Sequence, residues 1–369
     1  MSTTPIDIRP QPGPQEDFLA SSADIVIYGG AAGGGKTFGL LMDPLRYVSN
    51  PQFGAVLFRR TYPEITQEKG IWDESQRLYG YFDTRVNESD LKHTFPSGAT
   101  VRFAHLQHEK TKYNYKSSQI AYLGFDELTS FTESQFFYML SRNRSVSGVP
   151  PCVRACTNPE PGWVADLIRW WLHTDEGHPR YGYPIEARAG RLRYFARGTD
   201  DELIWGASKG EVLEQAPHLK EGELDPRHAI KSLTFIPATI YDNQILLDKN
   251  PEYLANLKMQ SKVERERLLG GNWFVTAAGG DYFDRSDFEV PFARRKYSRI
   301  FSPLSPERFD SDPFSDFPWA RCGRERSIER RNSSSCFRAI CLAFSFFWFF
   351  ASSFIFLEAC FIFRPASCW

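Results

Sequence analysis

A glycine-rich loop that ends in a lysine and a threonine carries the clearest chemical signal in this sequence. The apolar run Ile25-Val-Ile-Tyr28 predicts a buried strand before the loop, and a helical pattern follows it. In that setting the spacing G-x-x-x-x-G-K-T, from Gly30 to Thr37, is typical of a loop that binds nucleotide phosphates. A glycine-rich turn after an ordinary strand is the alternative, but the complete motif between strand and helix favours phosphate binding.

The residue types in this loop match the chemistry of phosphate binding. Glycines lack a Cβ atom, so backbone N–H groups can approach phosphate oxygens, and the N-terminus of the following helix adds a favourable dipole. Lys36 is expected to reach the β- and γ-phosphates, and Thr37 to bind Mg²⁺. The predicted nucleotide-binding residues of the loop are Gly30, Gly33, Gly34, Gly35, Lys36 and Thr37.

An acidic pair, Asp126 and Glu127, follows a second apolar stretch at 120–125. Asp126 is expected to hold the magnesium shell, and Glu127 to orient and deprotonate the attacking water. An Asp-Glu pair can also cap a helix, but its combination with the phosphate loop favours catalysis. Because the adjacent glutamate would activate water, the pair favours a hydrolase over a kinase, which needs a site for a phosphate acceptor.

Two amide side chains are further candidates for nucleotide contacts. Asn158 follows a third apolar strand at 152–156 and is expected to sense the γ-phosphate, with a plain turn residue as the alternative. Gln15 precedes Phe18 in a Pro/Gln-rich arm, where its amide is expected to contact the adenine edge. The alternative is that this arm is disordered and Gln15 has no such role.

Two arginines, Arg142 and Arg144, come at the end of the helix that follows the acidic pair. One of them is expected to reach the γ-phosphate of a neighbouring subunit as an arginine finger. Arginines at a helix end also interact favourably with the helix dipole, and that structural alternative stays open. The pair Arg59 and Arg60, after a strand at 54–58, is a rival source of the finger.

The strands and helices that must position these residues predict an α/β fold, a P-loop NTPase with a mostly parallel sheet flanked by helices. Carboxyl ends of parallel strands share one edge, where ligands bind, so Lys36, Asp126 and Asn158 are expected to converge. The charged run at 262–267 is interpreted as a solvated helix face. The other predicted elements are a helix after the loop that Pro44 shortens, hairpins at 92–95 with 100–106 and 191–196 with 203–206, a helix capped at Thr132, and a helix at 253–269.

The composition of the whole chain sets limits on function. The 369 residues allow about two domains, and the net charge of −1 gives no global attraction to nucleic acid. Any DNA contact must therefore come from a local patch. Only Cys152 and Cys156 precede residue 300, and the N-terminus has no signal pattern, so we expect a cytoplasmic protein.

The last part of the chain, from about residue 291, differs in kind from the rest. Five of the seven cysteines fall there, and Ala339 to Leu357 contains no charged residue. That length is sufficient for a membrane span. We favour the other interpretation, a truncated or frame-disrupted tail, because alternation, capping and turn signals all stop together near Pro291.

The ordered set of motifs resembles the ATPase region of the large terminase subunit, the DNA-packaging motor of tailed bacteriophages. The resemblance covers about residues 10 to 290. Its later segments discriminate best, because many phosphate-loop motors share only the first motifs. The segments that carry it are Pro14-Gln-Glu-Asp-Phe-Leu19, the phosphate loop, Phe58-Arg-Arg-Thr-Tyr62, Leu123-Gly-Phe-Asp-Glu-Leu128, Ser141-Arg-Asn-Arg-Ser145, Thr157-Asn-Pro159, Phe235-Ile-Pro-Ala-Thr-Ile-Tyr-Asp-Asn243 and Glu264-Arg-Glu-Arg-Leu-Leu-Gly-Gly-Asn-Trp273.

The resemblance implies a P-loop NTPase that uses ATP and Mg²⁺ to move double-stranded viral DNA into a prohead. It also implies a homo-oligomeric ring on the portal protein, recruited with a small terminase subunit, and an RNase H-like nuclease domain. After Phe288 no strand ending in a metal-binding carboxylate follows, and Asp310, Asp312 and Asp316 lie in a Pro/Ser-rich stretch. We therefore expect the nuclease activity to be lost.

These observations predict three regions. They are an ATPase domain at 1–245, a helical linker at 246–290 and a nuclease remnant at 291–369. A non-catalytic remnant of a decayed prophage gene and another P-loop translocase or helicase are the alternative functions. A helicase would need a second motor domain, for which the chain has no room.

Overall fold

The computed structural model describes residues 8–221 and 225–276. The chain divides into two compact units, Met1–Arg285 and Ser286–Trp369, and every described residue belongs to the first. The predictions for 291–369, including the apolar stretch Ala339 to Leu357 and the aspartates 310, 312 and 316, lie outside the described residues. The boundaries at 245 and 290 stay predictions. Within the described part of the chain, no helix has the length and apolar character that a membrane crossing requires.

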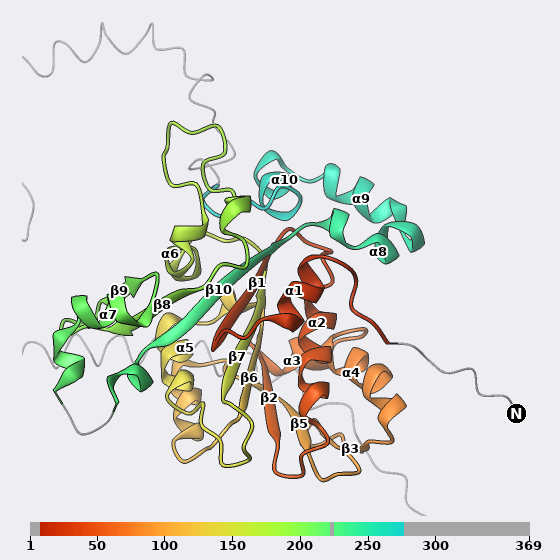
Figure 1. The fold of residues 1–369 in the computed structure, drawn as a ribbon. Coiled ribbons are helices and arrows are strands. Elements are labelled where there is room, and N and C mark those ends of the chain that lie inside the picture. The colour runs from red at the N-terminus through yellow and green to blue at the C-terminus, as the bar shows by residue number, and fades with distance from the viewer. Residues whose placement is uncertain (1–7, 222–224, 277–369) are drawn as a thin grey trace, which may run out of the picture. The chain divides into compact units, whose positions relative to one another are not determined.

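Ten strands form one sheet in the described residues, in the order β3-β4-β5-β2-β6-β7-β1-β10-β8-β9. From β5 to β10 every neighbouring pair is parallel, and antiparallel hairpins extend both ends (Figure 1). This arrangement confirms the predicted α/β fold class. The strands are β1 (Ile25–Gly30), β2 (Gly54–Arg59), β3 (Arg85–Asn87), β4 (Lys92–Thr94), β5 (Thr100–His105), β6 (Tyr122–Asp126), β7 (Cys152–Thr157), β8 (Arg193–Arg197), β9 (Leu203–Gly206) and β10 (Lys231–Ala238).

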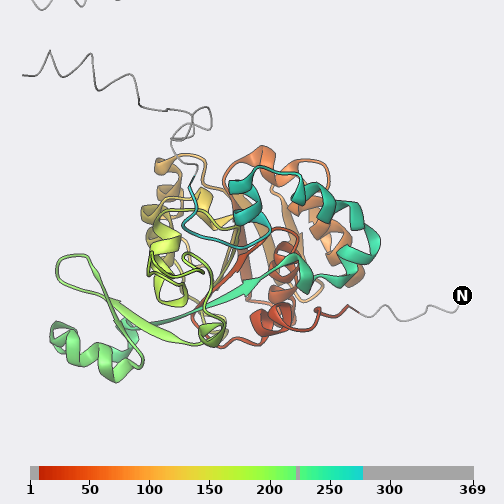
Figure 2. The same cartoon turned by 90° about the horizontal axis from the view of Figure 1, so that it is seen from above.

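Helices cover both faces of the parallel strands, while β8 and β9 with α7 extend to one side in light green (Figure 2). The α-helices are α1 (Pro14–Ala20), α2 (Lys36–Met42), α3 (Tyr62–Thr66), α4 (Ile71–Tyr79), α5 (Glu133–Leu140), α6 (Trp163–Leu167), α7 (Lys209–Gln215), α8 (Gln244–Lys249), α9 (Pro251–Lys258) and α10 (Lys262–Leu268). Short 3-10 helices are η1 (Asp43–Tyr47), η2 (Gly80–Phe82), η3 (Glu109–Tyr115), η4 (Leu128–Ser130), η5 (Arg169–Trp171), η6 (Glu186–Arg188), η7 (Pro217–Lys220), η8 (Pro226–Ala229) and η9 (Ile240–Asp242).

The apolar run of β1 serves two cores because alternate side chains point to opposite faces of the sheet. Val26 and Tyr28 belong to the core beneath α1, α2 and α4. Ile25 and Ile27 belong to the core beneath α5 and α6. A strand buried on both faces reads as a continuous apolar run, which is why β1 is recognisable in the sequence. Its carboxyl end is thereby fixed in the centre of the sheet.

Local signals explain where the helices begin and end. Pro44 cannot continue an α-helix, and α2 ends at Met42 before the 3-10 helix η1. Thr132 begins α5 with a capping box, as predicted. The single helix predicted at 253–269 is two helices, α9 and α10. The break occurs because the Ser261 hydroxyl accepts a hydrogen bond from the backbone N–H of Glu264 and so caps a new helix.

A buried histidine on β4 ties α4 to the sheet. His93 is fully buried against the rings of Trp72 and Tyr79, with ring centroids 4.9 and 5.0 Å away. Its Nε2 and Nδ1 atoms pair with the hydroxyls of Ser75 at 3.0 Å and Thr84 at 3.3 Å. Burial lowers the pKa of His93 to about 4 because the charged form loses its hydration.

We expect His93 to make the protein less stable in acid. In the unfolded chain an ordinary histidine binds a proton at about pH 6.5, whereas folded His93 binds one only near pH 4. Between these values the unfolded state holds more protons, so the free energy of unfolding falls as the pH falls, by at most about 3 kcal/mol. Urea unfolding at pH 7, 5.5 and 4.5 measures this effect for wild type and His93→Gln. A wild-type-minus-variant difference that does not change with pH would contradict it.

Candidate functional site

The topology brings the ends of three neighbouring strands together. β6, β7 and β1 are adjacent and parallel, so their carboxyl ends share one edge of the sheet. The phosphate loop, residues 30–37, follows β1, Asp126 ends β6, and Asn158 follows β7. Helices α8, α9 and α10 lie along the same edge (Figure 1). The expected convergence of Lys36, Asp126 and Asn158 is therefore confirmed.

The phosphate loop has the backbone conformation that its glycines permit. Gly33 and Gly35 have φ angles of 79° and 71°, which residues with a Cβ atom rarely adopt. Lys36 begins α2 and is 8% exposed. Its Nζ atom donates hydrogen bonds to the carbonyls of Gly30 at 3.2 Å and Ala31 at 2.6 Å. Burial lowers the pKa of Lys36, while the negative charge of Glu127 opposes that shift.

Asp126 connects the phosphate loop to a cation on the neighbouring strand. The Thr37 hydroxyl donates to Asp126 Oδ1 across 3.2 Å. On the other side, Arg59 at the end of β2 donates to Asp126 Oδ2 from Nε at 2.8 Å and lies 2.5 Å from it through Nη2. The Asp126 side chain is 1% exposed. Thr37 and Asp126 thus lie in contact, close enough together for both to bind one metal ion.

Glu127 faces Asn158. The Asn158 Nδ2 atom lies 3.3 Å from each carboxylate oxygen of Glu127 and donates to them. Glu127 has a φ angle of 59°, which is uncommon for a residue other than glycine and often marks a functional position. Burial raises the pKa of Glu127, the charge of Asp126 raises it further, and Arg59, Lys36 and Asn158 act in the opposite direction. A carboxylate with a raised pKa is a better proton acceptor.

The donors present suit magnesium bound together with a phosphorylated ligand. Thr37 and Asp126 offer the oxygen atoms that Mg²⁺ prefers. Among residues 8–221 and 225–276, no three His, Cys, Asp or Glu side chains gather to hold a metal alone. Magnesium in nucleotide enzymes commonly takes only one or two protein ligands and completes its shell with phosphate oxygens and water. The site therefore fits a magnesium–nucleotide complex.

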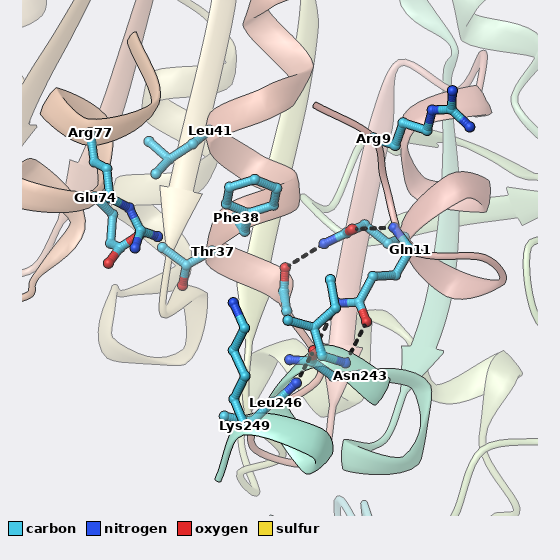
Figure 3. Close-up of a pocket in the computed structure, with 13 residues that line it drawn as sticks. Arg9, Gln11, Thr37, Phe38, Leu41, Glu74, Arg77, Asn243, Leu246 and Lys249 are labelled. Carbon is cyan, nitrogen blue, oxygen red and sulfur yellow. Dashed lines mark hydrogen bonds and ion pairs between the residues drawn. The ribbon is translucent and has the colours of Figure 1, made fainter. Parts of the chain in front are cut away.

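A cavity of about 560 Å³ adjoins the phosphate loop (Figure 3). Its volume lies within the range of small-ligand sites. Phe38 and Leu41 of α2 form one wall, the Glu74–Arg77 ion pair of α4 stands beside them, and Lys249 points in from α8. The full lining is Arg9, Gln11, Gln15, Gly35, Thr37, Phe38, Leu41, Glu74, Arg77, Asn243, Ile245, Leu246 and Lys249.

Gln15 lines this cavity, but its amide already has partners within the chain. Its Nε2 atom donates to the carbonyl of Gly35 at 2.9 Å, and its Oε1 atom accepts from the backbone N–H of Gln11 at 2.7 Å. The residue is 3% exposed. The alternative of a disordered arm is wrong for residues 8 to 20, because Gln15 fixes this arm against the phosphate loop. Contact with adenine stays a prediction.

Asn243 ties the phosphate loop to α8 and was not a sequence candidate. Its Nδ2 atom donates to the carbonyl of Gly33 at 2.6 Å, and its Oδ1 atom accepts from Gln11 Nε2 at 2.7 Å (Figure 3). The same Oδ1 atom caps α8 through the N–H of Leu246. No spacing rule connects positions 210 residues apart, so local sequence patterns could not have found this contact.

The end of α10 contacts both the phosphate loop and the turn after β7. The N–H of Ala32 donates to the carbonyl of Leu268 at 2.6 Å. Arg267 Nε donates to the carbonyl of Pro159 at 3.2 Å, next to Asn158. The interpretation of 262–267 as a solvated face is therefore wrong for Arg267, whose side chain is 23% exposed and lies against the site.

The structure separates the arginine candidates. Arg142 and Arg144 lie beside Ile120 at the amino end of β6, opposite the edge that holds Lys36. Arg142 packs over the Tyr138 ring at 5.2 Å and donates to the carbonyl of Lys116. These two arginines are thus not brought to the phosphate loop of their own chain, and action on a neighbouring subunit stays a prediction.

The two rival arginines have different partners. Arg59 contacts Asp126 inside the site, whereas Arg60 Nη1 donates to Oε1 of the buried Gln135 in α5 at 2.6 Å. Arg59 therefore lies within the site, whereas Arg60 packs against α5. The sequence identifies both arginines as candidates. It does not show which of them reaches the site, because the sequence does not reveal that β2 and β6 are neighbours in the sheet.

Comparison with protein families gives a match that spans most of the described chain. Residues 27–290 match the family described as terminase large subunit, T4likevirus-type, N-terminal. No curated protein sequence matches the chain. The matched region contains the phosphate loop, the acidic pair, Asn158 and the helices α8 to α10.

Solved structures of large terminases resemble the chain at low sequence identity. The large terminase from a thermophilic bacteriophage is 16% identical, with a TM-score of 0.47 over 75% of this chain and 57% of that one. The large terminase ATPase domain of Thermus phage P74-26 is 12% identical, with a TM-score of 0.42 over 71% of this chain and 93% of that domain. The chain thus spans little more than half the length of the first of these proteins.

Proposed function

Because the chain belongs to the family of T4likevirus-type terminase large subunits, N-terminal region, we propose that it hydrolyses ATP to drive the packaging of phage DNA. The observation that carries this proposal is the set of contacts at the carboxyl edge of the sheet. There Thr37 contacts Asp126, and Asn158 contacts Glu127, beside the buried ammonium group of Lys36. The proposal assigns phosphate binding, metal binding and water activation to this one small region.

The chemistry follows from the placement of each side chain. Glu127 takes a proton from water, and the water oxygen bonds to the γ-phosphorus as the bond to the bridging oxygen of ADP breaks. Lys36 and the backbone N–H groups of the loop hold the phosphates and stabilise the charge that spreads over them. Thr37 and Asp126 would hold Mg²⁺, which supplies further positive charge to the phosphates.

The remaining assignments complete the proposal. Asn158, which holds the Glu127 carboxylate, senses the γ-phosphate, and Gln15 contacts the adenine at the wall of the cavity. Arg142 or Arg144 acts on the γ-phosphate of a neighbouring subunit, because both lie on the opposite edge of their own sheet. The partners are double-stranded DNA, a portal protein, a small terminase subunit and further copies of this chain in a ring inside the host cell.

ATP turnover by the full chain, with and without DNA, tests this function. We expect turnover that requires Mg²⁺ and rises when linear double-stranded DNA is added. Stimulation by single-stranded DNA alone would instead favour a helicase. ATP binding without any turnover, also in the presence of DNA, would favour a non-catalytic remnant.

A further inference from the structure

Arg59 forms an ion pair with the carboxylate of Asp126, the side chain that the proposed function assigns to the metal ion. Its Nε and Nη2 atoms both approach Asp126 Oδ2, at 2.8 and 2.5 Å, from the end of β2. β2 and β6 are adjacent parallel strands, and Phe58 pairs with Phe125, so Arg59 and Asp126 emerge side by side at the same edge. The arginine side chain is 15% exposed, so the pair is largely removed from water.

Electrostatics explains why Arg59 pairs with Asp126. Asp126 is buried and its neighbour Glu127 carries a second carboxyl group, and buried carboxylates need a nearby cation. Lys36 does not touch Asp126, because its ammonium group donates to the carbonyls of Gly30 and Ala31. Arg59 is thus the cation that neutralises Asp126 in the described structure. A divalent ion on Asp126 would take over that task.

An arginine released from Asp126 would lie beside the bound phosphates. Arg59 also interacts electrostatically with Glu127, which the proposed function places next to the attacking water. The guanidinium group is always charged and presents parallel N–H donors that match phosphate oxygens. The proposed function places the γ-phosphate, the group that distinguishes ATP from ADP, nearest to Glu127.

We infer that Arg59 neutralises Asp126 when no metal is bound and turns to the γ-phosphate of ATP when Mg²⁺ takes its place. This inference rests on the proposed function, since it names a residue of the same site. It makes Arg59 a catalytic residue supplied by the chain that binds the nucleotide. Arg142 and Arg144 lie at the other edge and would act between chains.

Removing Arg59 should have two opposite effects on binding. Mg²⁺ loses its competitor for Asp126, so less Mg²⁺ should be needed for half-maximal binding of a fluorescent ADP, by about fivefold. The γ-phosphate loses a charged donor, so the preference for ATPγS over ADP should fall by at least about tenfold. If Arg59 had only a structural role, its removal would weaken the binding of both nucleotides and would not lower the Mg²⁺ requirement.

Fluorescence titrations of the full chain measure both quantities for wild type, Arg59→Ala and Arg59→Lys. N-Methylanthraniloyl ADP is titrated with Mg²⁺ and is then displaced with ATPγS or ADP. Arg59→Lys keeps the charge without the planar fork, so we expect values between those of wild type and Arg59→Ala. Arg60→Ala is the matched control, because Arg60 contacts Gln135 rather than Asp126 and should change neither quantity.

The outcomes separate this inference from the function beneath it. If wild type hydrolyses ATP, and Arg59→Ala keeps the wild-type Mg²⁺ requirement and the wild-type preference for ATPγS, the assignment of Arg59 is wrong and the proposed function stands. If wild type shows no Mg²⁺-dependent nucleotide binding, both are wrong. A loss of binding in Arg59→Ala without the improved response to Mg²⁺ would also reject the exchange of partners.

Discussion

Replacement of Glu127 by glutamine is expected to reduce ATP turnover by about 10²- to 10⁴-fold, the usual contribution of a general base. Glutamine keeps the shape of the side chain and can still accept a hydrogen bond from Asn158, but it cannot take a proton from water. Nucleotide binding should survive, because Lys36 and the loop glycines remain in place. Steady-state turnover and binding of a fluorescent ATP analogue, measured on the same preparation, test both parts.

The pH dependence of the wild-type rate is a second test of Glu127 as the general base. Only the ionised carboxylate can act as the base, and burial raises the pKa of this residue above the ordinary glutamate value. The rate should therefore fall on the acid side at a higher pH than an ordinary glutamate would cause. In Glu127→Gln that acid limb should be absent from the remaining activity.

Glu133→Gln is the control for the change of charge. Glu133 lies in the first turn of α5 and is exposed, so its loss should leave turnover unchanged. Equal turnover of wild type and Glu127→Gln would show that another group activates the water, and the assignment of Glu127 as the base would then be abandoned.

The parts of the site that were predictable from the sequence are those that depend on local order along the chain. An apolar strand followed at once by the phosphate loop places Lys36 and Thr37, and the strand before Asp126 does the same for the acidic pair. A general rule for parallel sheets then brings the strand ends together without knowledge of the strand order. The roles followed from chemistry, and the convergence from topology.

The contacts that were not predictable depend on strand order or on long-range packing. Arg59 reaches Asp126 only because β2 is the neighbour of β6 in the sheet. Asn243 and Arg267 reach the site from helices that follow β10, far along the chain. The division of α9 from α10 differs from these cases. Its signal, Ser261 followed three residues later by Glu264, was present in the sequence and was missed.

Replacement of Gly30 by alanine is expected to destabilise the fold by about 4 kcal/mol, through the sum of a steric clash and backbone strain. An added Cβ atom would lie 2.1 Å from the carbonyl oxygen and 2.7 Å from the nitrogen of Ala238, which pairs with Gly30 in β10. Both atoms belong to the backbone of a central strand, so no side chain can rotate to make room. The φ angle of 144° at Gly30 also disfavours alanine.

Urea unfolding of Gly30→Ala beside Gly80→Ala separates this clash from a general effect of adding a methyl group. Gly80 has a φ angle of −57°, and no atom lies within 4 Å of the position of its added Cβ, so alanine should be nearly neutral there. Similar stabilities of the two variants would mean that β1 and β10 can separate without cost.

The pairing of β1 with β10 also positions the phosphate loop, because the carbonyl of Gly30 accepts a hydrogen bond from Lys36. The clash at Gly30 would disturb this pairing. We therefore expect Gly30→Ala to lose nucleotide affinity even where it remains folded, whereas Gly80→Ala should bind as wild type does.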